Sequence, residues 1–144
     1  KDEARRIVER KNINNCTVSS VAPEMMTEAL ADVKFGFVLR EDDPVNCVAT
    51  PTKLSSYLSA GVIPVFSKYL KDFYNKTKNF EYVVPVSDFK PTEKLKNLLV
   101  EEIEIKKLIS EYTELFNTYY NPQYYIKQYK EKMCKLLEEK YGSK

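Results

Sequence analysis

The chain contains no histidine, and its cysteines are few. The cysteines, Cys16, Cys47 and Cys134, show no paired spacing. Because zinc sites are built mainly from histidine and closely spaced cysteine, we expect no zinc site. A disulfide framework is not expected either, since such frameworks need several paired cysteines in secreted chains. The cysteine usage therefore favours a reducing, cytoplasmic location.

Long apolar runs are also missing. No segment reaches the length that a transmembrane helix needs, and the N-terminus lacks the charged-then-apolar plan of a secretory signal. Lysines in residues 127–144 suit contact with an anionic membrane, whereas the interleaved glutamates favour a solvated surface. We expect a soluble cytoplasmic protein, with peripheral contact at the inner face of the membrane as an open alternative.

An excess of one charge is the third absence. The chain has 144 residues, with 23 lysines and arginines against 21 acidic residues, and a formal net charge of +2. This balance does not suggest nucleic acid as the main partner. The length suits one domain with a real core and is too short for two ordinary ones.

The most informative stretch of the chain is residues 49–65. It predicts a short helix that Thr50 caps, that begins with Pro51, and that ends at Gly61 in the left-handed conformation. A buried strand follows. The N-terminus of such a helix presents free backbone N–H groups, and together with Lys53 it forms a candidate site for phosphate or pyrophosphate.

Helix and strand signals alternate through the first two thirds of the chain. Strands are predicted at residues 16–21, 33–39, 62–66 and 82–86, and helical segments at residues 2–11, from Pro23, after Thr50 and around 68–75. Strands separated by helices at this spacing predict parallel βαβ units wound into one Rossmann-like sheet, an α/β fold. Ligands of such sheets bind beyond the carboxyl ends of the strands.

The chain is predicted to be helical alone after Pro91. An apolar stripe from Leu95 to Tyr119 repeats at the three-four spacing of one helical face. Asn121-Pro122 breaks the helix. A last helix is then predicted to turn its apolar residues inward and its lysines and glutamates outward. These inward-facing residues are predicted to be Ile126, Tyr129, Met133, Leu136 and Leu137.

Several motifs carry a resemblance to a known family. They are Ala31-Asp32-Val33 before the strand 35–39, Pro51-Thr52-Lys53-Leu54 with Tyr57-Leu58, and Gly61-Val62-Ile63-Pro64-Val65. Together they resemble the C-terminal domain of a retaining GT-B glycosyltransferase of the group 1 family, also called family 4. The resemblance extends over roughly residues 1–144. It implies a single nucleotide-sugar-binding domain that lacks an N-terminal acceptor domain and its own first strand, and that alone does not turn over substrate.

The resemblance also implies a function and a set of donor-binding residues. The substrate would be a nucleotide-diphosphate sugar, UDP- or GDP-linked. The acceptor would be a saccharide or lipid-linked molecule of cell-envelope polysaccharide synthesis. Such enzymes resemble one another in needing no bound metal or other cofactor for the transfer. The implied donor-binding residues are Ser20, Val21, Ala22, Arg40, Glu41, Thr50, Thr52, Lys53 and Ser56.

These residues fall into three groups. By the resemblance, residues 20–22 form the turn that faces the nucleotide base, and residues 40–43 through Thr50 face the donor sugar and phosphates. Thr52 and Lys53 stand where the pyrophosphate is cradled. No catalytic residue is assigned.

One position departs from the family pattern. Ser56 stands where the family usually has a glutamate that binds the ribose hydroxyls, and Val48 stands near the expected partner glutamate. A serine cannot accept two hydroxyls as a carboxylate does. Glu41 or its acidic neighbours could substitute from the loop. The alternative hypothesis is a non-catalytic scaffold or interaction domain with the same fold.

Each candidate also has a purely structural interpretation. Ordinary capping explains Thr50 to Lys53 as well as phosphate binding does, and Arg40 could pair with Glu41 on the surface. The acidic run 41–43 is more typical of a solvated loop than of a metal site. The tyrosines between residues 119 and 129 fit core packing or an interface better than a stacking platform.

Overall fold

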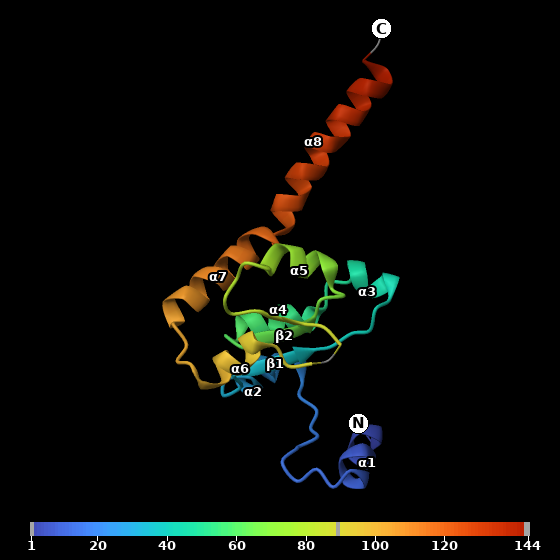
Figure 1. Cartoon of the computed structure of the whole chain (residues 1–144). Helices are drawn as coiled ribbons and strands as arrows, with labels where there is room; N and C mark the ends of the chain where they lie inside the picture. The colour runs from blue at the N-terminus through green and yellow to red at the C-terminus, as the bar shows by residue number, and fades with distance from the viewer. Residues whose placement is uncertain (1, 89, 143–144) are drawn as a thin grey trace.

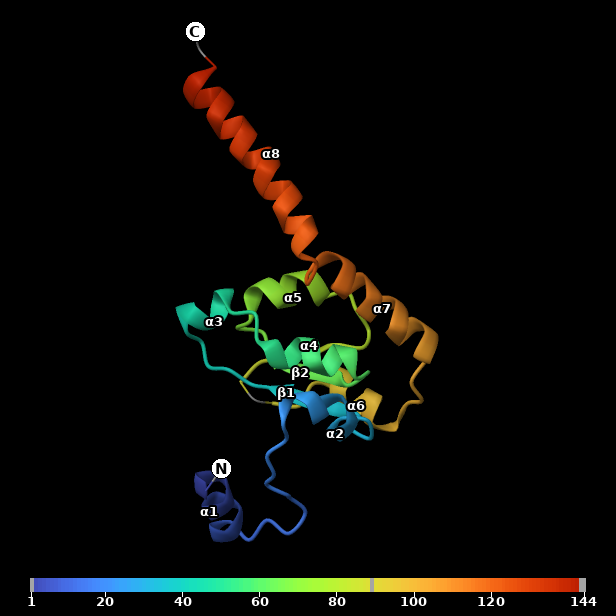
Figure 2. The same ribbon diagram turned by 180° about the vertical axis from the view of Figure 1, so that it is seen from behind.

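The computed structural model describes residues 2–88 and 90–142. Residues 23–120 form its central part, called the body below. Figure 1 shows helix α1 (Asp2–Arg10) on one side of the body, at the end of an extended segment, and helix α8 (Pro122–Tyr141) projecting from the other side. Figure 2 shows the same separation from behind. Among the described residues, no helix is both long enough and apolar enough to cross a membrane.

A parallel sheet of three strands lies at the centre of the body. The strands are β1 (Phe35–Val38), β2 (Ile63–Ser67) and β3 (Val84–Val86), in the order β1-β2-β3. Phe35 pairs with Ile63, and Val65 pairs with Val84. Every residue of the central strand is buried, as expected for a parallel sheet covered on both faces. The predicted α/β class is therefore confirmed at this level: a small parallel sheet flanked by helices, compatible with a Rossmann-like arrangement.

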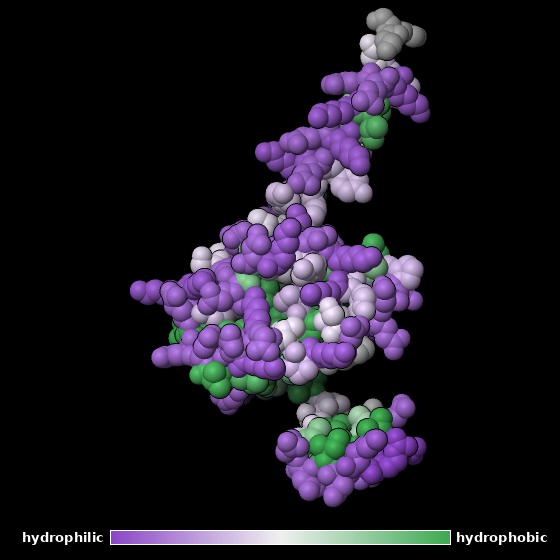
Figure 3. Space-filling model, viewed as in Figure 1, coloured by the Kyte–Doolittle hydropathy of each residue, from purple (hydrophilic) through white to green (hydrophobic). Residues whose placement is uncertain are grey.

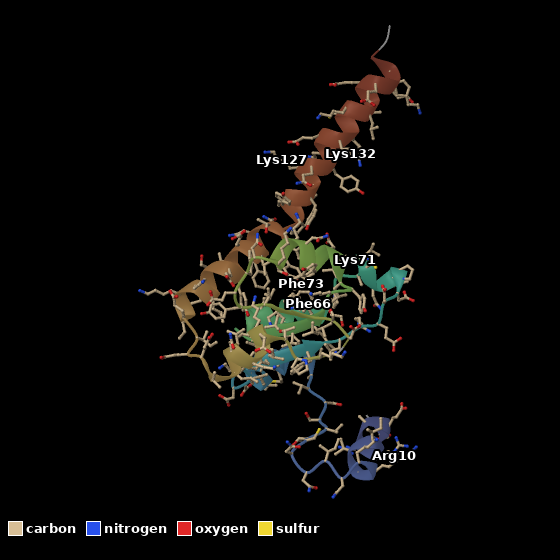
Figure 4. The ribbon with its side chains drawn as sticks, viewed as in Figure 1. Arg10, Phe66, Lys71, Phe73, Lys127 and Lys132 are labelled. Atoms are coloured by element: carbon tan, nitrogen blue, oxygen red, sulfur yellow. The ribbon has the colours of Figure 1, made fainter. Side chains whose placement is uncertain are left out.

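Helices cover both faces of this sheet (Figure 1). One face carries α4 (Thr52–Ser59), α5 (Lys71–Thr77) and α7 (Ile105–Thr118). The rings of Phe66 from β2 and Phe73 from α5 meet edge to face, with centroids 4.9 Å apart (Figure 4). The opposite face carries α6 (Glu93–Val100), which begins where the Thr92 side chain accepts a hydrogen bond from Leu95 N.

Two tyrosines and a glutamate fix α7 against the strands. The buried hydroxyl of Tyr112 lies 3.1 Å from Val62 O and 2.9 Å from Tyr82 O, and donates to these carbonyls. The carboxylate of Glu111 accepts from the backbone N–H groups of Glu81 and Tyr82. The Tyr82 hydroxyl in turn accepts from Glu104 N. The bonds of Tyr112 pair the carbonyls of Val62 and Tyr82, which would otherwise be buried without partners.

The strand predicted at residues 16–21 is wrong. These residues are irregular, and all except Val18 are exposed. A short β-prone run becomes a strand only where it pairs with a neighbour, and none of its residues takes part in the sheet. After it come the short helices η1 (Pro23–Met25) and α2 (Met26–Ala29), which confirm the helical start predicted at Pro23.

The prediction missed one short helix in the polar loop after β1. Helix α3 (Pro44–Val48) begins where the Asp43 side chain accepts a hydrogen bond of 2.8 Å from Val45 N. Pro44 occupies its first turn. An aspartate followed by proline is a standard helix start, so the sequence did carry this signal.

The prediction that the last helix packs inward is also wrong. Its apolar residues lie on a helix that leaves the body, so they are exposed. The break at Asn121-Pro122 is confirmed, because the Asn121 side chain caps α8 by accepting a hydrogen bond from Gln123 N. Among the tyrosines, Tyr119 is buried in the core, whereas Tyr124, Tyr125 and Tyr129 are exposed.

Candidate functional site

The loops that follow the three strands meet at one edge of the sheet. Arg40 follows β1, Lys68 follows β2, and Lys90 lies four residues after β3. Because the strands are parallel, their carboxyl ends share this edge. It is the edge at which open α/β sheets bind ligands, and it carries three basic residues.

Direct hydrogen bonds join neighbouring loops at this edge. The backbone N–H of Arg40 donates to the hydroxyl of Ser67, at 2.6 Å, and Lys68 N donates to Val86 O, at 2.9 Å. Ser67 is buried, so its hydroxyl needs such a partner. These bonds hold the start of the Arg40 loop against the end of β2, while the Arg40 side chain stays exposed.

Helix α4 starts near this edge with an uncapped N-terminus. Pro51 occupies the N-cap position in an extended conformation, and it makes no side-chain capping bond to the N–H groups of the first turn. The first N–H groups of a helix have no partner within the helix, so Thr52 and Lys53, both exposed, present theirs to solvent. This end is suited to an anion, since the helix dipole adds positive potential to the charge of Lys53.

Thr50 does not have the predicted capping role. Its hydroxyl shares a hydrogen bond of 3.2 Å with the hydroxyl of Tyr119, and Pro51 takes the N-cap position instead. The bond ties the segment before α4 to the end of α7. Burial raises the pKa of Tyr119 to about 12, which keeps this phenol neutral and able to donate. Since Thr50 does not cap α4, the N–H groups of the first turn are less covered than the sequence predicts.

Gly61 has the predicted conformation. Its φ is 72°, the left-handed region that stops a helix, directly before the chain enters β2. A Cβ at this position would meet no atom within 4 Å, so only the backbone conformation demands glycine here.

Gly36 positions α4 for a different reason, which the sequence analysis did not use. A Cβ on Gly36 would lie 2.5 Å from Cε2 of Tyr57, so the ring of Tyr57 packs directly on the strand. The Tyr57 hydroxyl donates to Phe37 O at 3.4 Å. A glycine in the middle of a strand often marks such a close approach. The pair sets the distance between α4 and β1.

Ser56 does not point a free hydroxyl at the helix start. Its hydroxyl donates to Thr52 O at 3.3 Å, and that of Ser55 donates to the same carbonyl at 2.8 Å. Both serines thus bond within α4 and do not replace the two-oxygen chemistry of a carboxylate.

Acidic side chains border the same edge. Asp43 caps α3, and the backbone carbonyl of Glu41 accepts from Asn46 Nδ2 at 3.0 Å. The carboxylate of Asp88, with a smaller effect from Asp42, raises the pKa of Tyr69. Within the described parts of the chain, no three cysteine, aspartate or glutamate side chains gather as a metal site would require.

In the described part of the chain, no hydrogen bond joins residues 20–22 to the other predicted site residues. Ser20, Val21 and Ala22 lie in the exposed segment before η1, and no strand is formed by the described residues that precede them. The prediction of a loop that follows a strand is therefore wrong for these residues. Arg40, Glu41, Thr50, Thr52, Lys53 and Ser56 belong to the body, in the loops and helix that follow β1.

The hollow beside this edge is shallow. A groove of about 80 Å³ is lined by Phe37, Leu39, Val65, Val86, Lys90, Pro91 and Leu95. Pockets that enclose small molecules are usually several times larger, about 300 to 1,000 Å³. The groove lies on the face of the sheet that α6 covers, and none of the predicted donor-binding residues lines it. Since Thr52 and Lys53 are exposed, a ligand at the start of α4 would remain partly open unless a second surface covered it.

The comparisons with known proteins add no relative. Neither the family models, nor the curated proteins, nor the solved structures match this chain.

Proposed function

We propose that this chain is the donor-binding domain of a glycosyltransferase of the GT-B type, which binds a nucleotide-diphosphate sugar for cell-envelope polysaccharide synthesis in the cytoplasm. The observation that carries the proposal is the uncapped N-terminus of α4, with Lys53 exposed beside it, near the carboxyl edge of a parallel sheet. Such a helix end stabilises a diphosphate through backbone N–H groups and charge. The sequence motifs around Pro51 and Gly61 support the same proposal.

The chemistry asked of these residues is electrostatic. Transfer of a sugar leaves negative charge on the departing diphosphate. The first N–H groups of α4, the ammonium of Lys53 and the guanidinium of Arg40 would hold that charge in place. Arg40 suits this role because its backbone is fixed to Ser67 while its side chain remains free to reach a ligand.

The exposure of the candidate residues supports a two-surface site. Arg40, Thr52 and Lys53 are all exposed, so a nucleotide sugar bound to them would lie largely in solvent. A second surface, which would also carry the saccharide or lipid-linked acceptor, would exclude water and bring the acceptor hydroxyl to the sugar. On this proposal the chain binds nucleotide weakly and transfers no sugar by itself.

Ser56 favours a second candidate, a non-catalytic scaffold or interaction domain of the same fold. Its hydroxyl and that of Ser55 are both used within α4, at Thr52 O. Helix α4 contains no aspartate or glutamate, so it offers no carboxylate to a ribose. On this hypothesis the chain would show no selective nucleotide binding.

Calorimetric titration of the chain with UDP, GDP and ADP separates the candidates. Saturable binding of UDP or GDP at millimolar concentration or tighter supports the donor domain. Lys53→Gln should weaken that binding about fivefold, because it removes one charge-assisted contact. Lys78→Gln is the matched control. It removes the same charge at the C-terminal end of α5, and it should leave binding unchanged.

Either of two results would overturn the proposal. One is the absence of saturable binding for all three nucleotides. The other is an equal loss in Lys53→Gln and Lys78→Gln, which would show that only the net charge of the chain matters.

A further inference from the structure

Helix α8 carries an apolar face that nothing in the described structure covers. Six of its large apolar side chains, which are between 38% and 72% exposed, lie on this face. At 100° per residue they fall within an arc of about 120°, the width of a helix face that normally packs against a partner. The six residues, called the α8 stripe below, are Tyr125, Ile126, Tyr129, Met133, Leu136 and Leu137. Figure 3 shows apolar side chains on α8 among hydrophilic ones.

The start of α8 is firmly held, and the helix beyond it projects from the body. The Tyr125 hydroxyl donates to Tyr119 O at 2.8 Å, and Asn121 caps the first turn. Lys127 and Lys132 both lie beyond the body on the projecting helix (Figure 4). Folding α8 back onto its own body would break the bond to Tyr119 and the cap.

A shallow groove runs along one side of the stripe. Its volume is about 340 Å³. Its lining residues are Tyr125, Gln128, Tyr129, Lys132, Met133 and Leu136, all from α8. The groove therefore has one wall only, and a second helix laid along it would supply the other.

Charges are separated along the length of α8. Residues 127–135 contain four lysines and one glutamate, whereas Glu138 and Glu139 follow in the next turn. Two copies that run in the same direction would place lysine beside lysine, and Lys140 of one opposite Lys140 of the other. Two copies that run in opposite directions would place the basic part of each beside the acidic part of the other.

We propose that the α8 stripe is a self-association surface, on which α8 of a second copy of this chain packs in antiparallel orientation. Residues 129, 133, 136 and 140 follow the heptad spacing of a two-helix seam. The register that pairs Met133 with the partner's Leu136 makes Tyr129 face the partner's Lys140. It also places Lys132 beside the partner's Glu139, and the two-fold symmetry repeats this ion pair.

The bodies leave room for this register. It aligns Tyr141 with the partner's Gln128, seven residues short of Asn121, where α8 leaves the body. At 1.5 Å per residue this leaves about 10 Å between the end of one helix and the body of the other copy.

Glu139 favours a second copy over an anionic membrane as the occupant. It lies at nearly the same angle around the helix as Lys132, two turns further along, at the border of the α8 stripe where a lipid surface would come close. An anionic surface would repel this carboxylate, whereas the antiparallel pair gives it a lysine partner.

Sedimentation velocity of the chain from micromolar to millimolar concentration tests the proposal. We expect a reversible monomer–dimer equilibrium, weakened about fivefold or more by either Lys132→Glu or Glu139→Lys, because each creates two like-charge contacts. The double variant restores the pair with its signs exchanged, so its dimer constant should return to within about twofold of the original. Lys132 and Glu139 are seven residues apart on one helix, so only a second copy can bring them together.

Leu136→Glu provides an independent test of the α8 stripe. It should abolish the dimer while the circular dichroism and unfolding midpoint of the monomer stay unchanged, because Leu136 is exposed in the monomer. A chain that stays monomeric at millimolar concentration would overturn the proposal. So would failure of the double variant to recover. Binding of monomers to vesicles of phosphatidylserine, strengthened by Glu139→Lys and weakened by Lys132→Glu, would instead identify the stripe as a membrane surface and also overturn it.

Discussion

The backbone N–H of Arg40 donates a hydrogen bond of 2.6 Å to the hydroxyl of Ser67, which joins the loop after β1 to the end of β2. Ser67→Ala removes the acceptor and leaves the Arg40 N–H without this partner. We expect a loss of about 1 to 2 kcal/mol in the free energy of unfolding, measured by urea denaturation. Ser110→Ala, an exposed change on α7, is the control. Equal unfolding midpoints for the two variants would contradict the structural role of Ser67.

Gly36 and Tyr57 are expected to be energetically coupled. Gly36→Ala places a Cβ 2.5 Å from the Tyr57 ring, so either the ring or the strand must move. The expected cost is about 1 to 3 kcal/mol. In a Tyr57→Ala background the same change should cost less than half as much, because the clash is gone. A double-mutant cycle with no coupling would show that the close packing of α4 on β1 is not what requires glycine.

The hydroxyl of Tyr112 is expected to stabilise the join between α7 and the sheet. Tyr112→Phe keeps the ring and removes the donor to Val62 O and Tyr82 O. Because the site is buried, we expect a loss of about 1 to 3 kcal/mol in thermal or urea unfolding. Tyr129→Phe, on the exposed part of α8, should change the stability of the monomer by less than about 0.5 kcal/mol. Similar effects of the two changes would argue against the two carbonyl bonds.

The buried tyrosines predict how stability depends on pH. Burial raises the pKa of Tyr119 to about 12 and also raises the pKa values of Tyr112 and Tyr120, whereas in the unfolded chain each titrates near 10. A raised folded pKa gives stability that is fully present below pH 10. That stability is lost as the pH rises from 10 through the folded pKa, because the unfolded state releases its protons first.

Urea midpoints measured between pH 8 and 12 test this prediction. The urea concentration at the midpoint should decrease as the pH rises beyond 10. The decrease should be less steep in Tyr112→Phe, which has one buried phenol fewer. An unchanged slope in that variant would assign the fall to other groups, such as the lysines. The chain has no histidine, so we expect no stability transition from an imidazole near pH 6.5.

The sheet was largely predictable because its strands are short apolar runs with clear ends. The run that follows Gly61 becomes β2, and the positive φ of that glycine appears as expected. Residues 16–21 also contain β-prone valine and threonine but form no strand, since pairing depends on a neighbour that composition does not identify. Periodicity likewise identified which face of α8 is apolar, but it could not say what that face contacts.

The candidate site was predictable to a smaller extent. Parallel strands dictate that the loops at Arg40 and Lys68 share an edge, so topology alone indicates where the candidate site lies. Thr50 was assigned to the cap of α4, because a hydroxyl beside proline fits that role in sequence, whereas the fold brings Tyr119 within reach of it. Ser67 and Tyr57 were missed because their partners, Arg40 and Gly36, are more than 20 residues away along the chain.

The most direct test of the central claim is the amide spectrum of the ¹⁵N-labelled chain during titration with UDP and GDP. The account predicts saturable shifts at Arg40, Thr52 and Lys53, around the start of α4, and none at the end of α8 beyond Met133. No shift at millimolar nucleotide, or shifts confined to residues outside the carboxyl edge of the sheet, would contradict a nucleotide-diphosphate site at this helix end.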